Sequence, residues 1–200
     1  LREFDEENVE TIYSESFAVQ GMGKAIMNRL EKAAGHLRIS ASAVAKQQKY
    51  RRITFVCGTD TALAPMAAEI LRHYDLKQEY VIDSRGIVVL FPEPANQKAE
   101  AIMKSAQMTL EGHVSRGVDE ENFQEDSLIL AIDESQKHKL LAEYGQAQNI
   151  YTLSEFVESD VEVPDPYGKP LTAYGECFEI LRELVEKLAK KLDSLVEEEQ

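Results

Sequence analysis

From Arg51 onward, short apolar runs rich in strand-forming residues alternate with segments whose apolar residues repeat at helical spacing. The strand-like runs lie at 53–57, 80–84, 128–132 and 149–152, and helical patterns lie at 65–73, 96–108, 135–144 and 173–195. The continuous apolar run 128–132 is typical of a strand covered on both faces. This order predicts an α/β domain with three α/β/α layers, in which helices cover both faces of a parallel sheet of about four strands.

The first strand, Ile53–Cys57, ends in a turn-rich loop that leads into a helix opened by Pro65. Proline at a first-turn position is compatible with a helix. In parallel α/β folds, ligands bind beyond the carboxyl ends of strands, and N–H groups at a helix N-terminus attract anions. A cysteine in this position is expected to have a depressed pKa, because the N–H dipoles stabilise the thiolate. Cys57 is therefore a candidate nucleophile, with a small buried residue at a strand end as the alternative.

A second Pro-rich loop, 163–170, precedes the last helix and contains Asp165. A carboxyl group on a loop facing an anion site can protonate a leaving group. The alternative for Asp165 is a turn residue before Pro166. No metal ion or cofactor is expected, because the two cysteines, Cys57 and Cys177, have neither CxxC nor paired spacing.

The net charge of −14 argues against nucleic acid or an anionic membrane as a partner of this domain. The longest apolar runs are far shorter than the ~20 residues that span a bilayer. Two cysteines without a disulfide pattern indicate a reducing compartment, so we expect a cytoplasmic protein. The chain begins without a methionine, which fits a piece of a longer protein.

The run from Ile53 to Leu71 resembles the signature of the low-molecular-weight protein tyrosine phosphatases. That signature is a strand, a Cys, five residues, an Arg, then Ser-Pro-Met-Ala and a helix. Three further segments resemble family segments in the family's order: 83–87 the Ser-Ala-Gly segment, 113–116 the His-x-Ser/Ala-Arg segment, and 163–168 the Asp-Pro-Tyr/Phe loop.

The resemblance implies a phosphotyrosine phosphatase I-like fold over residues 50–196 and a phosphorylated protein, or a phosphate-like anion, as ligand. Cys57 would form a cysteinyl-phosphate, Asp165 would be the general acid and Tyr167 would form a pocket wall. The phosphate loop would comprise Gly58, Thr59, Asp60, Thr61, Ala62, Leu63 and Ala64.

This loop departs from the family pattern. Leu63 stands where the family has Arg, Ala64 where it has Ser, Asp60 where it has Asn, and Ala62 where a second Cys is common. The missing guanidinium would supply two charge-assisted hydrogen bonds of ~1.5–3 kcal/mol each. Comparable arginines contribute roughly 10³–10⁵ in the rate of phosphoryl transfer. The sequence therefore predicts an impaired or inactive phosphatase.

Two readings of the loop remain beside inactivity. Arg85 or Arg116 could replace the missing guanidinium, which would leave an active phosphatase for phosphotyrosine or phosphoarginine. Thr61 and Gly168 match the bacterial protein-arginine phosphatases of the family. Thiol redox chemistry at Cys57 alone is a third reading, although Ala62 leaves no nearby partner thiol.

Residues 1–49 differ in character and predict a strand over 9–17 and a helix over 21–34. They resemble the last strand and helix of long-form threonylcarbamoyl-adenylate synthases. This N-terminal strand-helix extension has too few apolar residues for a core of its own. We therefore expect a synthase remnant and linker over 1–49, with self-association through these residues as one way to bury it.

Overall fold

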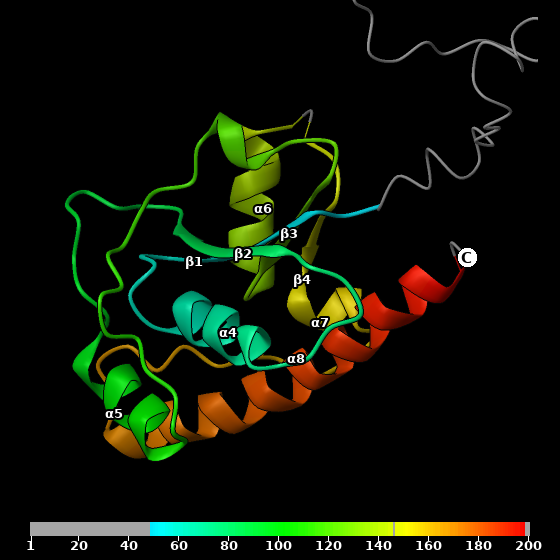
Figure 1. Ribbon diagram of the computed structural model, residues 1–200. Coiled ribbons are helices and arrows are strands. Elements are labelled where there is room, and N and C mark those ends of the chain that lie inside the picture. The colour runs from blue at the N-terminus through cyan, green and yellow to red at the C-terminus, as the bar shows by residue number, and fades with distance from the viewer. Residues whose placement is uncertain (1–48, 146, 199–200) are drawn as a thin grey trace, which may run out of the picture. The chain divides into compact units, whose positions relative to one another are not determined.

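The computed structural model describes residues 49–145 and 147–198 (Figure 1). The expected strand and helix within 1–49 lie outside the described residues. The chain divides into two units, Leu1–Gln47 and Gln48–Gln200, of which the second contains the whole described fold. Within the described part, no helix is both long enough and apolar enough to cross a bilayer.

The second unit is built on one sheet of four parallel strands in the order β2-β1-β3-β4. The strands are β1 (Arg52–Cys57), β2 (Val81–Gly86), β3 (Ser127–Ala131) and β4 (Ile150–Thr152). The central strands β1 and β3 are almost completely buried, which explains their continuous apolar sequences.

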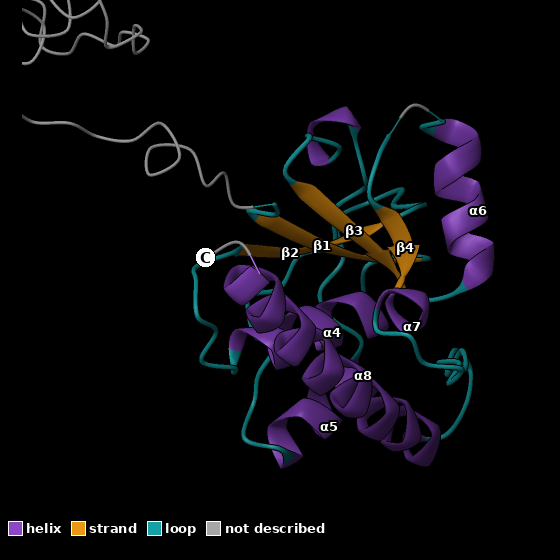
Figure 2. Cartoon of the chain, turned by 90° about the vertical axis from the view of Figure 1, so that its right-hand side faces the viewer, coloured by secondary structure: helices purple, strands orange, loops and turns teal. Residues whose placement is uncertain are grey.

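Helices cover both faces of this sheet (Figure 2). The helices are α4 (Leu63–Arg72), α5 (Gln97–Ser105), α6 (Glu134–Glu143), α7 (Leu153–Phe156) and α8 (Leu171–Glu198), with a 3-10 turn η1 (Glu120–Asn122). Figure 1 shows α6 on one side of the sheet and α4, α5, α7 and α8 on the other. The expected three-layer α/β/α architecture is confirmed.

Strand residues alternate between two hydrophobic cores, because successive side chains point to opposite faces. Ile53, Phe55 and Cys57 belong to the larger core, which contains α4 and α8, whereas Val56 belongs to the smaller core under α6. Cys57 therefore points toward α4, the helix that follows its own loop.

The expected elements are present with shifted ends, and one helix was missed. The second strand ends at Gly86 rather than Ser84, and the last helix runs to Glu198 rather than Leu195. The missed helix α7 has four residues, too few to show helical periodicity. Its local signal is a capping box between Thr152 and Glu155.

Candidate functional site

The loop after β1 turns its carbonyl groups outward. Five of its carbonyl oxygens each accept a hydrogen bond, with donor–acceptor distances of 2.6–3.0 Å. The donors are the N–H of Ile87 to Cys57, Val88 to Gly58, Asn96 to Thr61 and Met66 to Ala62, and His113 Nε2 to Asp60. The N–H groups of Ala64, Asp60 and Thr59 interact with the Cys57 thiol, as expected for an anion-binding loop.

The loop also depends on a close approach by β2. A Cβ atom on Gly86 would lie 2.7 Å from the carbonyl carbon of Thr59 and 2.9 Å from the nitrogen of Asp60. Only glycine permits this distance between the two backbones. At Asp60 the backbone has φ of 57°, a left-handed conformation that Asp and Asn adopt more readily than most residues.

The pKa of Cys57 is raised rather than depressed, which corrects the expectation from the sequence. Burial is the main cause, because the side chain is only 6% exposed and an apolar environment disfavours the thiolate. The N–H groups of the loop act in the opposite direction, and the charge of Asp60 adds to the increase. The thiol is free. Without a cation in the loop, the dipoles do not overcome burial.

The positions where the family has Arg and Ser are part of the hydrophobic core. Leu63 is 7% exposed and Ala64 is fully buried, and both belong to the same cluster as Cys57. Leu63 begins α4, and neither an acidic first-turn residue nor a side-chain hydrogen bond from Ala62 caps this helix.

The two candidate replacements for the missing guanidinium are both engaged elsewhere. Arg85 Nη1 lies 2.6 Å from Asp83 Oδ2 and donates to the Ser84 carbonyl oxygen at 2.8 Å. Arg116 Nη2 lies 2.7 Å from Asp83 Oδ1. These ion pairs on β2 argue against either side chain serving the loop.

The loop with the candidate general acid is anchored beside the first turn of α5. Asp165 is exposed, and its Oδ1 accepts a hydrogen bond from the Tyr167 N–H at 2.9 Å. Its charge contributes to the raised pKa of Tyr174, although burial is the larger cause. A hydrogen bond from the Asn96 side chain acts in the opposite direction on the pKa of Tyr174. The Asn96 N–H donates to the Thr61 carbonyl oxygen. The direct contact of this segment with α5 is the hydrogen bond from Lys98 Nζ to the Lys169 carbonyl oxygen at 2.5 Å, and Asn96 at the start of α5 is in turn bonded to the Cys57 loop.

Tyr167 is 83% exposed, and Gly168, with φ of 72°, allows the turn after it. Cys177 donates its thiol hydrogen to the Pro164 carbonyl oxygen at 3.1 Å and so holds the base of the segment. Asp165 is therefore both a turn residue and an accessible carboxyl group, while Tyr167 is free to form a pocket wall.

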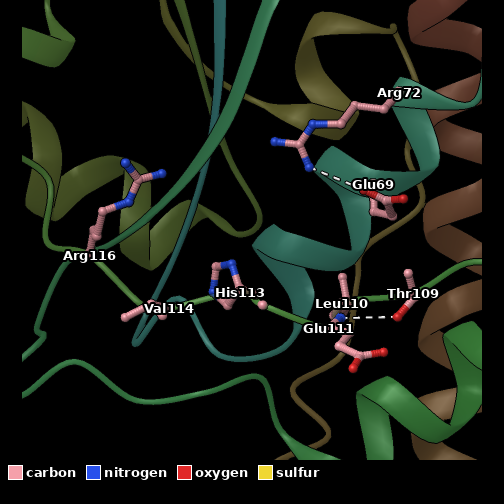
Figure 3. Close-up of a pocket in the computed structure, with 9 residues that line it drawn as sticks. Glu69, Arg72, Thr109, Leu110, Glu111, His113, Val114 and Arg116 are labelled. Atoms are coloured by element: carbon pink, nitrogen blue, oxygen red, sulfur yellow. Dashed lines mark hydrogen bonds and ion pairs between the residues drawn. The ribbon is translucent and has the colours of Figure 1, made fainter.

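A cavity of about 500 Å³ has His113 in its lining, the residue whose Nε2 donates to the Asp60 carbonyl oxygen. Figure 3 shows His113 drawn between Arg116 on one side and Glu69 and Arg72 of α4 on the other. The lining of the cavity contains no residue of the Cys57–Ala64 loop. It comprises Glu69, Arg72, Thr109–Val114 and Arg116. This cavity is separate from the predicted site.

The contacts of Asn96, Gly86 and Tyr174 with the site were not predicted from sequence. Gly86 is the glycine of Ser84-Arg85-Gly86, the run that was compared with the family's Ser-Ala-Gly segment. The sequence therefore carried a local signal for this glycine. Asn96 and Tyr174 had none, because their roles depend on contacts between distant segments.

Comparisons with known proteins agree with this geometry. The family model for low molecular weight phosphotyrosine protein phosphatase matches residues 52–198. The model for the C-terminal domain of threonylcarbamoyl-AMP synthase matches residues 1–35. A low molecular weight protein-tyrosine-phosphatase, PtpB, of Staphylococcus haemolyticus is 30% identical over 137 residues, covering 68% of this chain and 96% of that protein.

A protein-arginine-phosphatase of Geobacillus stearothermophilus is 28% identical over 145 residues, covering 72% of this chain and 97% of that protein. The structure of the YwlE arginine phosphatase from the same organism superimposes with a TM-score of 0.69 at 28% identity, over 75% of this chain and 97% of that one. The structure of a low molecular weight protein tyrosine phosphatase from T. tengcongensis superimposes with a TM-score of 0.65 at 32% identity, over 70% of this chain and 98% of that one.

The family model covers the whole described fold, including the Cys57 loop and the Asp165 segment. The chain therefore belongs to the low molecular weight phosphotyrosine protein phosphatase family.

Proposed function

We propose that residues 50–196 form a phosphatase domain that has lost catalysis and serves as a regulatory appendage. The observation that carries this proposal is the buried Leu63 in place of the loop arginine, with Arg85 and Arg116 both paired to Asp83. A phosphoryl group in the loop would meet N–H dipoles but no guanidinium, a loss comparable to roughly 10³–10⁵ in rate.

Residues 1–35 suggest what the domain regulates. Because they match the C-terminal domain of a threonylcarbamoyl-AMP synthase, we place the phosphatase-like domain behind such a synthase, with residues 1–49 as synthase remnant and linker. A cytoplasmic location fits the two free cysteines. Self-association through 1–49 belongs to the same proposal. The gene sequence upstream of Leu1 tests the fusion, which fails if no synthase precedes it.

The catalytic part is tested with p-nitrophenyl phosphate and phosphoarginine as substrates. We expect the wild-type protein to release no more phosphate than its Cys57→Ser variant. Wild-type turnover that Cys57→Ser abolishes would contradict the proposal. The Cys57→Ser variant is a matched control, since it keeps the size and position of the side chain.

The second candidate is an active phosphatase, favoured by the accessible Asp165 carboxyl and by Thr61, which lies one residue after the loop's left-handed bend. In this reaction Cys57 Sγ would form a bond to phosphorus while the bond to the tyrosine oxygen or arginine nitrogen breaks. Asp165 would give its proton to that leaving group, and water would then release phosphate from sulfur. The raised pKa of Cys57 argues against this candidate and against thiol redox chemistry, because both require a thiolate.

A further inference from the structure

The cavity beside α4 is lined by two separate parts of the chain. Glu69 and Arg72 belong to α4, whereas Thr109–Val114 and Arg116 belong to the connection between α5 and β3 (Figure 3). Its volume of about 500 Å³ lies within the roughly 300–1,000 Å³ of cavities that bind small organic molecules. A molecule of the size of a sugar phosphate would therefore fit.

Hydrogen bonds to the rest of the domain hold both walls of this cavity. His113 Nε2 donates to the Asp60 carbonyl oxygen at 2.6 Å, and the Arg116 N–H donates to Asp60 Oδ2 at 2.9 Å. On the α4 side, Arg72 Nη2 donates to the Ile82 carbonyl oxygen at 2.7 Å. Because the fold fixes both walls, a ligand would bind with little cost for ordering them.

The arginines near the cavity carry more charge than their acidic partners neutralise. Asp83 is shared by two of them, since its Oδ1 lies 2.7 Å from Arg116 Nη2 and its Oδ2 lies 2.6 Å from Arg85 Nη1. One carboxylate cannot neutralise two guanidinium groups, so one positive charge remains at this pair. Arg72 is paired separately with Glu69, at 3.2 Å. This surplus of positive charge stands out in a protein with a net charge of −14.

The two guanidinium groups in the lining also keep hydrogen-bond donors for a ligand. Each group has several N–H donors in a planar fork. Within the described part of the chain, Arg116 uses one of these for Asp83, and Arg72 uses one for Glu69 and one for a carbonyl group of β2. The other acidic residue of the lining is Glu111, and in Figure 3 its carboxylate points away from both guanidinium groups.

We propose that this cavity binds a small organic anion, a carboxylate or a phosphate ester, through the guanidinium groups of Arg72 and Arg116. A guanidinium group matches a carboxylate or a phosphate with two parallel hydrogen bonds, which a neutral ligand cannot reproduce. The inference goes beyond the proposed function, because the lining contains no residue of the Cys57–Ala64 loop. The cavity binds its anion whether or not the loop catalyses, and it gives a regulatory domain a ligand to respond to.

The test is a titration of the full chain with ribose 5-phosphate and with citrate at constant ionic strength, followed by the backbone amide signals in NMR spectra. Ribose is the matched control ligand, because it has the same sugar without the phosphate group. We expect saturable shifts that are largest at 109–116, with a Kd of ~1 mM or below, and no shifts with ribose. Binding of one anion alone would also support the proposal, and would assign the cavity to phosphate esters or to carboxylates.

A pair of arginine variants tests the contacts. Arg116→Gln should raise the Kd at least tenfold, because it removes charge-assisted hydrogen bonds together with the surplus charge. Arg182→Gln is the matched control, since Arg182 has the same exposed fraction of 58%, is also paired with an acidic residue, and lies on α8 outside the lining. Its Kd should equal that of the wild type. The wild-type titration locates the anion even if a variant does not fold.

Three outcomes would overturn the inference. The first is that neither anion gives saturable shifts, and the second is that the largest shifts lie in the Cys57–Ala64 loop instead of at 109–116. The third is an equal Kd for Arg116→Gln and the wild type. Turnover of p-nitrophenyl phosphate by the wild type is a different result, which would contradict the proposed function and leave the ligand of the cavity unaffected.

Discussion

Replacing Leu63 with Arg should give the loop an affinity for inorganic phosphate that the wild-type protein lacks. Leu63 opens α4 between the N–H groups of Thr59, Asp60 and Ala64 that surround Cys57, and it stands at the position where the family has its arginine. Two charge-assisted hydrogen bonds to a phosphate would contribute about 3–6 kcal/mol. Because 1.4 kcal/mol corresponds to a factor of ten, affinity should rise roughly 10²–10⁴-fold.

The same substitution should destabilise the protein when no anion is present. Leu63 is only 7% exposed, and its transfer from the core to water costs about 1.5–3 kcal/mol. If the variant binds phosphate with a Kd of ~1 mM, 10 mM phosphate would raise its free energy of unfolding by about 1.4 kcal/mol through mass action. Phosphate should therefore stabilise the variant measurably while leaving the wild type nearly unchanged.

Urea unfolding with and without 10 mM phosphate, at matched ionic strength, measures both effects. Leu63→Met is the control, because it keeps an apolar side chain of similar volume and should cost less than about 1.5 kcal/mol with no phosphate effect. The reasoning is refuted if phosphate stabilises the wild type as much as it stabilises Leu63→Arg. That result would mean that the loop binds the anion through its N–H groups alone.

Three further predictions concern stability. Gly86→Ala should lower the free energy of unfolding by about 1–3 kcal/mol, because the new methyl group would meet the Thr59 backbone, which cannot move aside as a side chain can. Urea unfolding measures this, and a loss of less than about 0.5 kcal/mol, the usual size of a surface substitution, would contradict it. The folded pKa of Cys57 lies above its ordinary 9.0, so the unfolded chain ionises first and stability should fall as pH rises through about 9. This fall should be smaller in Cys57→Ser, as unfolding curves from pH 7 to pH 10 would measure. Glu155→Ala should lower the thermal midpoint by removing the side chain that accepts from the Thr152 N–H in the capping box, at a cost of about 1 kcal/mol, and an unchanged midpoint would argue that the cap is dispensable.

Much of the fold follows from local sequence. The buried strands β1 and β3 are continuous apolar runs, and α8 shows helical spacing over its length, so the parallel sheet and its covering helices could be predicted. Pro65 and the turn residues before it marked where a loop runs into a helix. Four motifs in the family's order identified the family, and the comparisons confirm it.

Local sequence could not establish the partners of the site residues. Asp60 meets His113 and the Arg116 backbone more than fifty residues along the chain, and Arg85 meets Asp83 rather than the loop. Such contacts depend on how the segment before β3 returns to the edge of β2, for which no local pattern exists.

The state of Cys57 shows the difference most clearly. Sequence established that a cysteine stands before a helix N-terminus and that no arginine follows it in the loop, since both are properties of residue order. It also led to the wrong direction for the pKa, because the dipoles of the loop were weighed without the depth at which the side chain is buried. The tertiary structure adds burial in the core and the neighbouring Asp60 charge, and both raise the pKa. Desolvation and through-space charge depend on what surrounds a group, which residue order alone does not specify.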